Sequence, residues 1–493
     1  MLKRALLSLV LGLVLFFSAS IVSGFAAENQ ALDMLDLEEV ISDVKLFYIK
    51  EPDQDTMVRG AIEGLLESLK DPYTEYLSPE DLKYFKSSVE GDYVGIGVQI
   101  QPAGDYPKVV NTIEGTPASA AGIKPGDLVV KVNGRDIAGE PLGKVVGEIT
   151  GEAGTKVRLT IRREGLKDID LELVRSNIST PTVTSRVVEG EIGLIRIKIF
   201  GESTEDEFQK ALDDLISKGV KKLILDLRDN PGGMLESAVD ITSDFVEPGQ
   251  VAVSTVDRSG RREEYLTEGT PAGKDMPIVV LVDEYSASAS EALAGALQDY
   301  GHATLIGGKT YGKGTVQVVI PLSAGGVLKI TTAKYHTPKD RVIDGTGLMP
   351  DIQVLTPYLP QAVAQRYLKN ADTNIITLEV GKNGSTVNGT EVKSGRVIQQ
   401  EGASYLPLRL MFEALGYRVD WQQGDGSIKV TGFQKEAIFH PGGGRFTING
   451  HDYPQGAPLL TIDGETYVRD TVFSLFDISQ KQEGSKITFE KKP

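Results

Sequence analysis

The sequence lacks cysteine entirely and has only four histidines among its 493 residues. Without cysteine, disulfides, thiolate nucleophiles and thiolate metal sites are excluded. The histidines, His302, His336, His440 and His451, are not spaced as metal ligands, so we expect no metal and no cofactor. Basic residues are outnumbered by acidic ones, and the net charge is −17. Since phosphate contacts need Lys and Arg, this charge argues against a nucleic-acid partner.

Length and composition predict several folded domains. Hydrophobic residues make up 40% of the chain and charged residues 25%, which is ordinary for globular proteins. One hydrophobic core rarely serves more than about 300 residues. The chain is therefore expected to contain about three domains.

The start of the chain has the pattern of an export signal. Lys3 and Arg4 precede an uncharged, largely apolar run over 5–22, and small residues follow at 23–27. We predict that residues 1–26 are a signal peptide. A retained membrane anchor is the alternative, because the 18-residue run is near the minimum length that spans a bilayer. Either way we expect an exported, extracytoplasmic protein of the cell envelope or the secreted fraction.

The remaining chain divides by its pattern of apolar residues into segments 28–90, 91–176, 184–360 and 376–493. The first is predicted to be a helical arm that packs on the core or on a second subunit. The second alternates short β runs with glycine and proline. The third alternates strands with helices, which predicts an α/β core with helices flanking a sheet.

The last segment contains an internal repeat. Asn388 and Asn449 each begin an Asn-Gly pair, and Tyr405 and Tyr467 each lie in a strand-like run followed by apolar residues at helical spacing. The offsets agree, because 449 − 388 = 61 and 467 − 405 = 62. We therefore predict a small α+β domain built from a duplicated β-β-α element.

The second segment begins with a Gly-Ile-Gly-Val sequence, Gly95, Ile96, Gly97 and Val98. Free N–H groups in such a loop can bind a carboxylate, and the following strand edge can accept a peptide. With the Gly-Thr-Pro-Ala, Ala-Gly-Ile-Lys-Pro-Gly-Asp and Val-Asn-Gly sequences within 115–134, the segment resembles a PDZ domain. The resemblance implies that the backbone N–H groups of Ile96 to Val98 hold the C-terminal carboxylate of a protein substrate. The alternative is a small β-barrel that only packs.

A serine-rich turn in the third segment is the first sign of chemistry. An apolar strand runs into Ser-Ala-Ser-Ala-Ser-Glu at 286–291, and a helix follows. Small residues permit a sharp turn that exposes one hydroxyl, and N–H groups at a helix start favour negative charge. The serine needs a base, but His302 and His336 each lie beside a strand-like run and are expected to pack or face solvent. A lysine desolvated enough to be neutral is the alternative base.

Lys313 is the candidate base. It lies between Gly312 and Gly314, which allow its backbone to approach another element closely. Gln317 follows four residues later and shares a face with Lys313 in a helix or a strand, so it can orient the amine. We expect the nearby Lys309 to be an ordinary solvated charge.

Together these motifs resemble the carboxyl-terminal processing, or tail-specific, serine peptidases over about residues 30–360. The resemblance implies a core with a crotonase/ClpP-like fold in a multidomain α/β protein. It also implies that Ser288 is the nucleophile, that Lys313 is the base 25 residues later (313 − 288 = 25), and that Gln317 is the third member.

The Asp-Leu-Arg-Asp-Asn-Pro-Gly-Gly sequence at 226–233 matches the glycine-rich turn of the same family. The resemblance implies an oxyanion hole formed by Ala289 N–H and the N–H of Gly232 or Gly233. The sequence does not choose between the two glycines.

The last segment is similar to the non-catalytic domain named after copper amine oxidase N-terminal regions, which occurs on exported proteins of Gram-positive bacteria. We expect no copper there, because His440 and His451 lack companions. Attachment to the cell wall or membrane surface, contact within a homodimer, and plain packing all remain open.

The resulting hypothesis is an exported endopeptidase acting on unfolded or tail-exposed protein substrates with apolar C-termini. The alternatives are a non-enzymatic adaptor and a crotonase-like acyl hydrolase or hydratase. The joint presence of Ser288, Lys313 and Gln317 argues against the adaptor. The export signal and the PDZ-like segment fit the second rival poorly.

Overall fold

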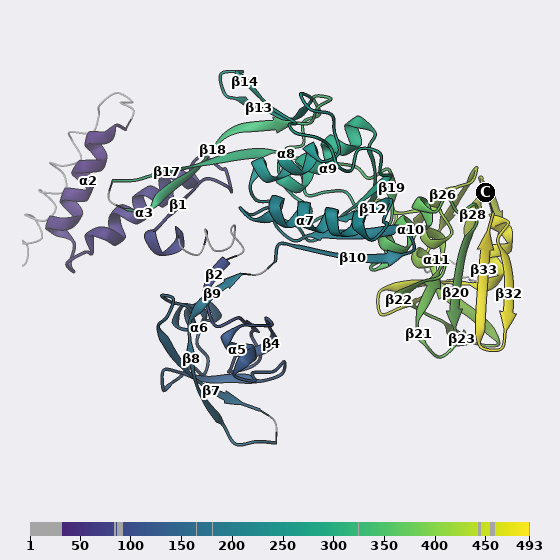
Figure 1. Cartoon of the computed structure of the whole chain (residues 1–493), viewed down its shortest axis with the longest axis horizontal. Helices are drawn as coiled ribbons and strands as arrows, with labels where there is room; N and C mark the ends of the chain where they lie inside the picture. The colour runs from purple at the N-terminus through teal and green to yellow at the C-terminus, as the bar shows by residue number, and fades with distance from the viewer. Residues whose placement is uncertain are drawn as a thin grey trace, which may run out of the picture. The chain divides into compact units, whose positions relative to one another are not determined.

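The computed structural model describes residues 32–82, 85, 92–163, 165–179, 181–323, 325–441, 445–453 and 459–492. The predicted signal peptide or anchor, residues 1–26, lies outside this set. Within it, no helix is both long enough and apolar enough to span a membrane. The chain forms two compact units, Met1–Tyr76 and Leu77–Pro493. The expected multidomain α/β organisation is confirmed, with N-terminal helices, a β-rich domain, an α/β core and a β-rich C-terminal domain (Figure 1).

The N-terminal unit contains two helices, α2 (Met34–Phe47) and α3 (Gln54–Glu67). Asp33 caps the first by accepting Leu35 N–H at 2.8 Å, and Asp53 caps the second by accepting Thr56 N–H at 2.7 Å. Strand β1 (Glu75–Leu77) follows. After β1 the chain is helical again from residue 79 to residue 82, where the continuous described segment ends.

The β-rich domain folds around one small core. Its strands and helices are β2 (Asp92–Gly95), β3 (Val98–Gln101), β4 (Lys108–Thr112), α5 (Pro117–Ala120), β5 (Leu128–Val132), β6 (Arg135–Asp136), α6 (Leu142–Ile149), β7 (Lys156–Arg162), β8 (Ile169–Val174) and β9 (Ser176–Ser179). The main sheet has the order β3-β4-β5-β7-β8, so β3 is an edge strand. β2 pairs with β9, which brings the entry and exit of the domain together.

A six-stranded sheet forms the centre of the α/β core. Its order is β10 (Val183–Glu189), β11 (Ile192–Ile197), β12 (Lys222–Asp226), β15 (Ile278–Val282), β16 (Ala303–Gly307) and β19 (Ile352–Gln353). All pairings are parallel except that of β10 with β11. Parallel strands buried on both faces explain the nearly continuous apolar sequence of β15, in which every residue is buried.

Helices cover both faces of this sheet, as the alternation of strands and helices predicted. Helices α7 (Thr204–Ser217), α8 (Leu235–Ser243) and α9 (Ala289–Tyr300) share one apolar core with Ile195, Leu225 and Val280. Helix α10 (Leu359–Leu368) packs with the alternate residues, such as Ile224 and Val279. The two cores therefore lie on opposite faces.

A second sheet was not predicted from the sequence. It includes β13 (Val251–Asp257), β14 (Arg262–Leu266), β17 (Thr315–Pro321) and β18 (Val327–His336). β18 pairs with both β17 and β13, and β14 pairs with β13. Because Lys313 lies just before β17, this sheet determines how the predicted base is held.

The C-terminal domain is the small α+β domain expected, and strands make up most of it. Its elements are β20 (Asn374–Glu379), β21 (Asn383–Val387), β22 (Thr390–Arg396), β23 (Ile398–Gln400), β24 (Ala403–Pro407), α11 (Leu408–Ala414), β25 (Arg418–Trp421), β26 (Ile428–Gly432), β27 (Lys435–Phe439), β28 (Phe446–Ile448), β29 (His451–Tyr453), β30 (Leu459–Ile462), β31 (Glu465–Arg469), the 3-10 helix η1 (Asp470–Phe476), β32 (Ser479–Glu483) and β33 (Lys486–Lys491).

The predicted internal repeat is confirmed. Asn388 and Asn449 both adopt positive φ in hairpin turns, and their side-chain oxygens accept N–H groups of Ile375 and Glu436 at 3.0 and 2.8 Å. β24 and β31 pair with each other, and each leads into a helix. The second helix, however, is the 3-10 helix η1 rather than an α-helix.

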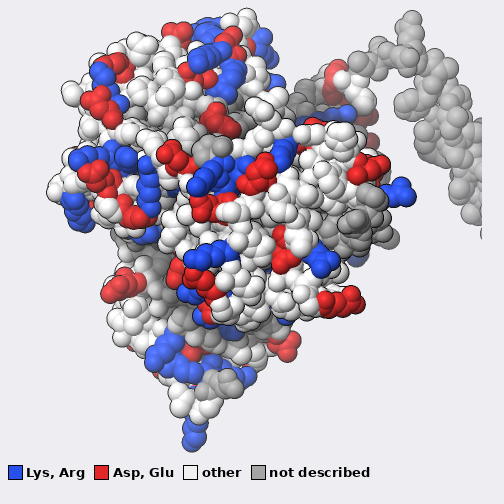
Figure 2. All heavy atoms as spheres, turned by 90° about the vertical axis from the view of Figure 1, so that its right-hand side faces the viewer, with Lys and Arg blue, Asp and Glu red and all other residues white. Residues whose placement is uncertain are grey.

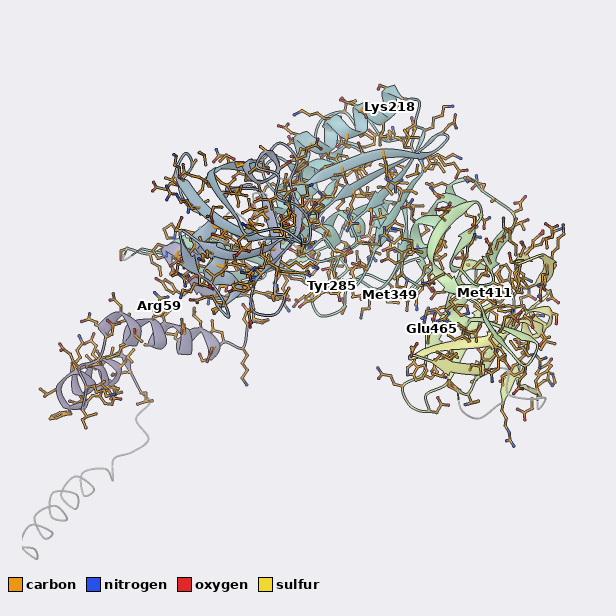
Figure 3. All side chains as sticks on the ribbon, turned by 90° about the horizontal axis from the view of Figure 1, so that it is seen from below. Arg59, Lys218, Tyr285, Met349, Met411 and Glu465 are labelled. Carbon is orange, nitrogen blue, oxygen red and sulfur yellow. The ribbon has the colours of Figure 1, made fainter. Side chains whose placement is uncertain are left out.

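The C-terminal domain shares a hydrophobic core with the α/β sheet. Residues of β11, β12, β15 and β16 belong to one apolar cluster with α10, α11 and the C-terminal strands, and Met411 of α11 is fully buried in it (labelled in Figure 3). The buried Glu413 of α11 also accepts the N–H groups of Leu355 and Thr356 at 3.1 and 2.8 Å. The third and fourth segments of the sequence are therefore joined through their interiors.

The face of the molecule shown in Figure 2 carries Lys and Arg side chains interspersed with Asp and Glu. Charged side chains of the described residues form many surface ion pairs, for example Arg418 with Asp420 at 2.7 Å. Such pairs contribute little to stability. This mixed surface differs from the basic stripe with which proteins bind nucleic acid.

Candidate active site

The serine-rich turn connects β15 to α9 and positions Ser288 at the helix start. Ser288 has φ +55° and ψ −117°, a strained conformation for a residue with a Cβ. The two other serines of the run are buried: Ser286 donates its hydroxyl to Leu227 O at 2.8 Å, and Ser290 donates to Asn230 O at 3.0 Å. Ser288 is partly exposed. Of the three hydroxyls, that of Ser288 can therefore meet a substrate.

The glycine-rich turn lies directly against Ser288. A Cβ on Gly232 would come within 2.6 Å of Ala287 O and 2.7 Å of Ser288 Cβ, and its φ is +99°. Both observations require glycine. The buried side chain of Asn230 fixes this turn, because its Nδ2 donates to Ile197 O at 2.9 Å and its Oδ1 accepts Gly232 N–H at 2.9 Å.

The two candidate glycines differ in the state of their N–H groups. The N–H of Gly232 is already bonded to Asn230. Those of Gly233 and Ala289 have no hydrogen-bond acceptor in the described part of the chain. A site for a negatively charged oxygen needs such free donors.

The loop that carries Lys313 is packed closely against residues 344–347. A Cβ on Gly312 would lie 2.9 Å from Gly347 N, and one on Gly314 would lie 2.3 Å from Asp344 N. The close approach expected of these glycines is therefore confirmed. Lys313 is partly buried, whereas Lys309 is exposed, as expected.

Glu291 joins the serine turn to the lysine loop, and sequence reasoning missed this role. Its fully buried carboxylate accepts the N–H groups of Ser288 at 3.0 Å, Gly312 at 2.8 Å and Lys313 at 2.9 Å, and the hydroxyl of Thr310. Burial raises its pKa, although these hydrogen bonds oppose the shift. The available signal was its place three residues after a helix-capping serine, where Glu completes a capping box.

Tyr335 of β18 makes a second connection that the sequence did not indicate. Its hydroxyl lies 2.9 Å from Ser288 O and 2.6 Å from Lys313 O, and its side chain is 1% exposed. It thus links the backbones of both predicted catalytic residues. The adjacent His336 points to the opposite face of the strand and lies 2.7 Å from Asp340 Oδ1. This agrees with the expectation that His336 has a packing role.

Gln317 lies on β17 with a partly buried side chain. Its Nε2 donates to Thr315 Oγ1 at 2.9 Å and to Thr331 Oγ1 at 3.2 Å. With both amide hydrogens engaged, the remaining group is Oε1, which can only accept a hydrogen bond. That is the polarity needed to orient an amine.

The loop at the start of β3 has the features of an anion nest. Gly97 has φ +77°, and a Cβ there would lie 2.3 Å from Thr116 Oγ1. Ile96 is 1% exposed and its carbonyl accepts Ala118 N–H at 2.8 Å. The N–H groups of Ile96 and Gly97 have no acceptor among the described residues. Gly95 lies at the end of β2, and Val98 begins the edge strand.

The C-terminal domain contains two of the four histidines of the chain, His440 and His451. No group of three or more His, Cys, Asp or Glu side chains suited to a metal was found among the described residues. The expectation that His440 and His451 bind no copper stays a prediction. No step of the chemistry is assigned to a metal.

Four family profiles match the chain. Peptidase family S41 matches residues 191–354 and a PDZ domain matches 108–163. The copper amine oxidase N-terminal domain matches 386–488, and the activating protease CtpB N-terminal domain matches 20–81. The serine turn and the lysine loop both lie inside the S41 match.

Curated relatives agree over most of the chain. A probable CtpA-like serine protease of Staphylococcus aureus (strain COL) is 34% identical over 426 residues, which cover 84% of this chain and 80% of the relative. A carboxy-terminal-processing protease of Bartonella bacilliformis is 39% identical over 342 residues, 68% of this chain and 77% of the relative.

Among solved structures, the photosystem II D1 C-terminal processing protease is similar, with 30% identity, a TM-score of 0.43, and coverage of 67% of this chain and 88% of that chain. The identity and coverage of the curated relatives, together with the S41 match, show that this chain belongs to the carboxyl-terminal processing serine proteases of peptidase family S41 and carries a PDZ domain.

Proposed function

We propose that the protein cleaves peptide bonds with Ser288 as nucleophile, Lys313 as general base and Gln317 as the residue that orients the amine. The observation that carries this assignment is the carboxylate of Glu291, which holds the N–H groups of Ser288 and Lys313 at 3.0 and 2.9 Å. The two residues come from loops far apart in the sequence. One buried side chain fixes both of their backbones.

In the proposed reaction, the uncharged amine of Lys313 accepts the proton of Ser288 as Oγ attacks the scissile carbonyl. The carbon–oxygen π electrons move to the oxygen, and a tetrahedral oxyanion forms. The lysine then gives its proton to the leaving nitrogen, and the C–N bond breaks to leave an acyl-enzyme. Water, deprotonated by the same amine, releases the acid and restores Ser288.

We assign the oxyanion hole to the N–H groups of Gly233 and Ala289 rather than that of Gly232. The support is that Gly232 N–H already bonds to Asn230 at 2.9 Å, whereas the other two N–H groups have no acceptor among the residues that the structure describes. Ala289 also begins α9, where the helix dipole favours a developing negative charge.

The PDZ domain binds C-termini of protein substrates. We propose that unfolded or tail-exposed proteins with apolar ends are preferred, and that the 95–98 loop holds the terminal carboxylate. The free N–H groups of Ile96 and Gly97 and the edge position of β3 support this part of the proposal. Amidation of the substrate C-terminus, with an uncharged end as the only change, is expected to weaken cleavage.

The catalytic assignment is tested by incubating the protein with an unfolded polypeptide that ends in apolar residues. Cleavage is followed by mass spectrometry for the wild type and for Ser288→Ala, Lys313→Ala and Lys309→Ala. The first two variants are expected to lose activity. Lys309→Ala, a matched control that removes an exposed lysine from the same loop region, is expected to retain it. Equal cleavage by all four proteins would contradict the assignment.

We further propose that the protein is exported and acts in the cell envelope or outside the cell. The charged start, the apolar run over 5–22 and the small residues at 23–27 support this. N-terminal sequencing of the protein from fractionated cells distinguishes a cleaved signal from a retained anchor. Light scattering and cell-wall fractionation test the predicted homodimer and the predicted association with the wall or membrane surface.

A further inference from the structure

The two turns that supply the proposed oxyanion hole are connected by a carboxylate that has no assigned role. The glycine-rich turn at 226–233 supplies the N–H of Gly233, and the serine turn at 283–289 supplies that of Ala289. Because the two donors come from separate segments, one oxygen can bind both only if the turns keep a fixed relative position. The connecting side chain is that of Asp283, directly after β15.

Asp283 accepts backbone N–H groups from both turns. In its own turn, Oδ1 accepts the N–H of Tyr285 at 3.0 Å and that of Ser286 at 3.1 Å. From the glycine-rich turn, the N–H of Asp229 lies 3.1 Å from Oδ1 and 3.1 Å from Oδ2. The side chain is partly buried, and bonds to a charged acceptor are stronger than neutral ones. Among the described residues, Oδ2 accepts only from the glycine-rich turn.

The contact with Asp229 matters because of the backbone conformation there. Asp229 has φ +60°, in the left-handed region that a residue with a Cβ seldom adopts. The carbonyl of the next residue, Asn230, accepts the N–H of Ala287 and the hydroxyl of Ser290, each at 3.0 Å. If Asp229 relaxed, Asn230 would move, and these two further bonds between the turns would be disturbed. The Asp283 carboxylate opposes this relaxation.

We propose that Asp283 is a positioning residue that sets the distance between the two donors of the oxyanion hole. This rests on the proposed function of Ser288, whose attack creates the negatively charged oxygen. Each donor lies four residues beyond an N–H group that the carboxylate holds, because 233 − 229 = 4 and 289 − 285 = 4. A shift at the carboxylate therefore reaches both donors through short segments. The carboxylate acts through the backbone of the two turns and transfers no proton.

Asp283→Asn removes the connection to the glycine-rich turn and keeps the local one. In the better orientation, the amide oxygen stands at the position of Oδ1 and still accepts the N–H groups of Tyr285 and Ser286. The NH₂ group then stands at the position of Oδ2 and faces the N–H of Asp229, and two donors repel each other. The serine turn is expected to keep its shape while the glycine-rich turn moves away.

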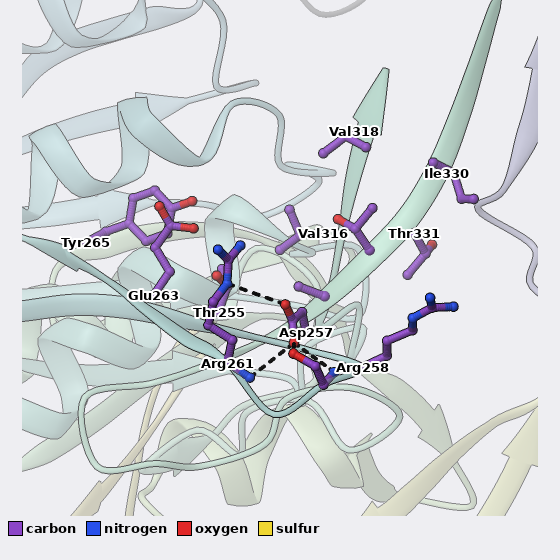
Figure 4. A pocket seen from close by; sticks show the side chains of 13 residues that line it. Thr255, Asp257, Arg258, Arg261, Glu263, Tyr265, Val316, Val318, Ile330 and Thr331 are labelled. Atoms are coloured by element: carbon purple, nitrogen blue, oxygen red, sulfur yellow. Dashed lines mark hydrogen bonds and ion pairs between the residues drawn. The ribbon is translucent and has the colours of Figure 1, made fainter. Parts of the chain in front are cut away.

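Asp257 provides a matched control. It is also partly buried, ends strand β13, and accepts N–H groups of the turn that follows, from Ser259 at 2.8 Å and Arg261 at 3.1 Å. Figure 4 draws Asp257 and its bonds in a groove whose lining, among the described residues, includes no predicted catalytic residue. Asp257→Asn removes a carboxylate charge at a strand end, as Asp283→Asn does, but leaves the active site untouched.

The experiment measures kcat and KM for a quenched fluorescent peptide with an apolar C-terminus. It also compares a peptide aldehyde with the alcohol of the same sequence as inhibitors. In the aldehyde complex, Ser288 Oγ bonds to the aldehyde carbon, the C=O π electrons move to its oxygen, and Lys313 keeps the serine proton. That oxygen occupies the oxyanion hole, whereas the alcohol binds without forming an oxyanion.

Asp283→Asn is expected to lower kcat about 10- to 100-fold, less than the roughly 100- to 1000-fold that loss of a whole oxyanion donor costs. The inhibition constant of the aldehyde should rise by a similar factor, while KM and the inhibition constant of the alcohol stay unchanged. Asp257→Asn should leave all four values at the wild-type level. Urea unfolding should give similar midpoints for the two variants.

The outcomes separate this inference from the proposed function. If Ser288→Ala cleaves the peptide as well as the wild type, the proposed function fails. If cleavage depends on Ser288 but Asp283→Asn keeps wild-type kcat, or weakens the alcohol as much as the aldehyde, only the role of Asp283 is overturned. It is also overturned if Asp283→Asn unfolds at much lower urea than Asp257→Asn, because the carboxylate would then hold the fold rather than the site.

Discussion

Replacing Glu291 with Gln tests whether one buried carboxylate sets the geometry of the active site. The change keeps the size of the side chain but turns one acceptor oxygen into an NH₂ donor. In the better orientation, the amide oxygen stands at the position of Oε2 and still accepts the N–H groups of Ser288 and Lys313. The NH₂ group then faces Gly312 N–H and the hydroxyl of Thr310.

The loss of unfolding free energy follows from the number of buried donors that lose an acceptor. The Thr310 hydroxyl can rotate to accept from the new NH₂ group, but Gly312 N–H cannot, so one buried donor loses its acceptor. Such a loss costs about 1–3 kcal/mol, and the two retained bonds weaken because the acceptor is no longer charged. We expect the unfolding free energy to fall by about 3 kcal/mol.

The expected loss of activity is larger than this stability cost implies. The affected loop carries Lys313, and a displacement of about 1 Å between reacting groups costs about 100-fold in rate. We therefore expect kcat/KM for a quenched fluorescent peptide with an apolar C-terminus to fall about 100-fold. Most of the fall should be in kcat, because Glu291 is a positioning residue buried away from substrate.

Glu413→Gln is the matched control. Glu413 is also a buried carboxylate that accepts two backbone N–H groups, but these belong to Leu355 and Thr356, next to the C-terminal domain. This variant should lose similar stability in urea unfolding and retain wild-type kcat. Unchanged kcat in Glu291→Gln, or an equal fall in both variants, would refute the reasoning.

Three further predictions concern single groups. Gly232→Ala should abolish peptide hydrolysis, because the new Cβ would collide with Ser288. Gly219 also has a positive φ, but open space surrounds it, so Gly219→Ala should lower the unfolding free energy by about 1 kcal/mol and leave peptide hydrolysis unchanged. Tyr335→Phe should lower kcat about tenfold, because the hydroxyl that contacts the carbonyls of Ser288 and Lys313 is lost. Tyr417→Phe is the control: it removes a buried hydroxyl bonded to a carbonyl in the C-terminal domain and should leave kcat unchanged. Equal kcat values for the two variants would contradict the role of Tyr335 in linking the two loops. Burial, and then nearby carboxylates, raise the pKa of Asp244 to about 7. Because this lies above the unfolded value of about 4, the native state binds the extra proton and loses stability as pH rises from 4 to 7. Asp244→Asn should therefore raise the unfolding free energy at pH 8 by up to about 4 kcal/mol and hardly change it at pH 4; a pH-independent effect in urea titrations would count against this.

The sequence predicted the parts of the site that depend on local pattern. The strand, turn and helix around Ser288 follow from an apolar run, small residues and a capping sequence, and α9 begins at Ala289, within the serine run. The need for Gly312 and Gly314 also followed from the sequence, because only a close backbone approach requires glycine on both sides of Lys313.

What the sequence could not predict depends on partners distant along the chain. Tyr335 is 47 residues from Ser288, and nothing in its strand-like surroundings indicates that its hydroxyl meets two loops. The choice between the glycines at 232 and 233 depends on the orientation of the Asn230 side chain. The second sheet depends on the pairing of β18 with β13, which precedes the serine turn, and with β17, which follows it.

The shared core of the α/β sheet and the C-terminal domain changes how that domain should be regarded. Alternate residues of the sheet, α10 and the C-terminal strands form one apolar cluster, and a chain cut after residue 370 would leave one face of α10 exposed to water. A fragment that ends where the match to the peptidase family ends would therefore be prone to aggregate and would not be a minimal protease. The terminal domain and the catalytic sheet should melt in one cooperative transition. In evolution, this domain could be replaced by another only if the face of α10 that packs against it changed at the same time.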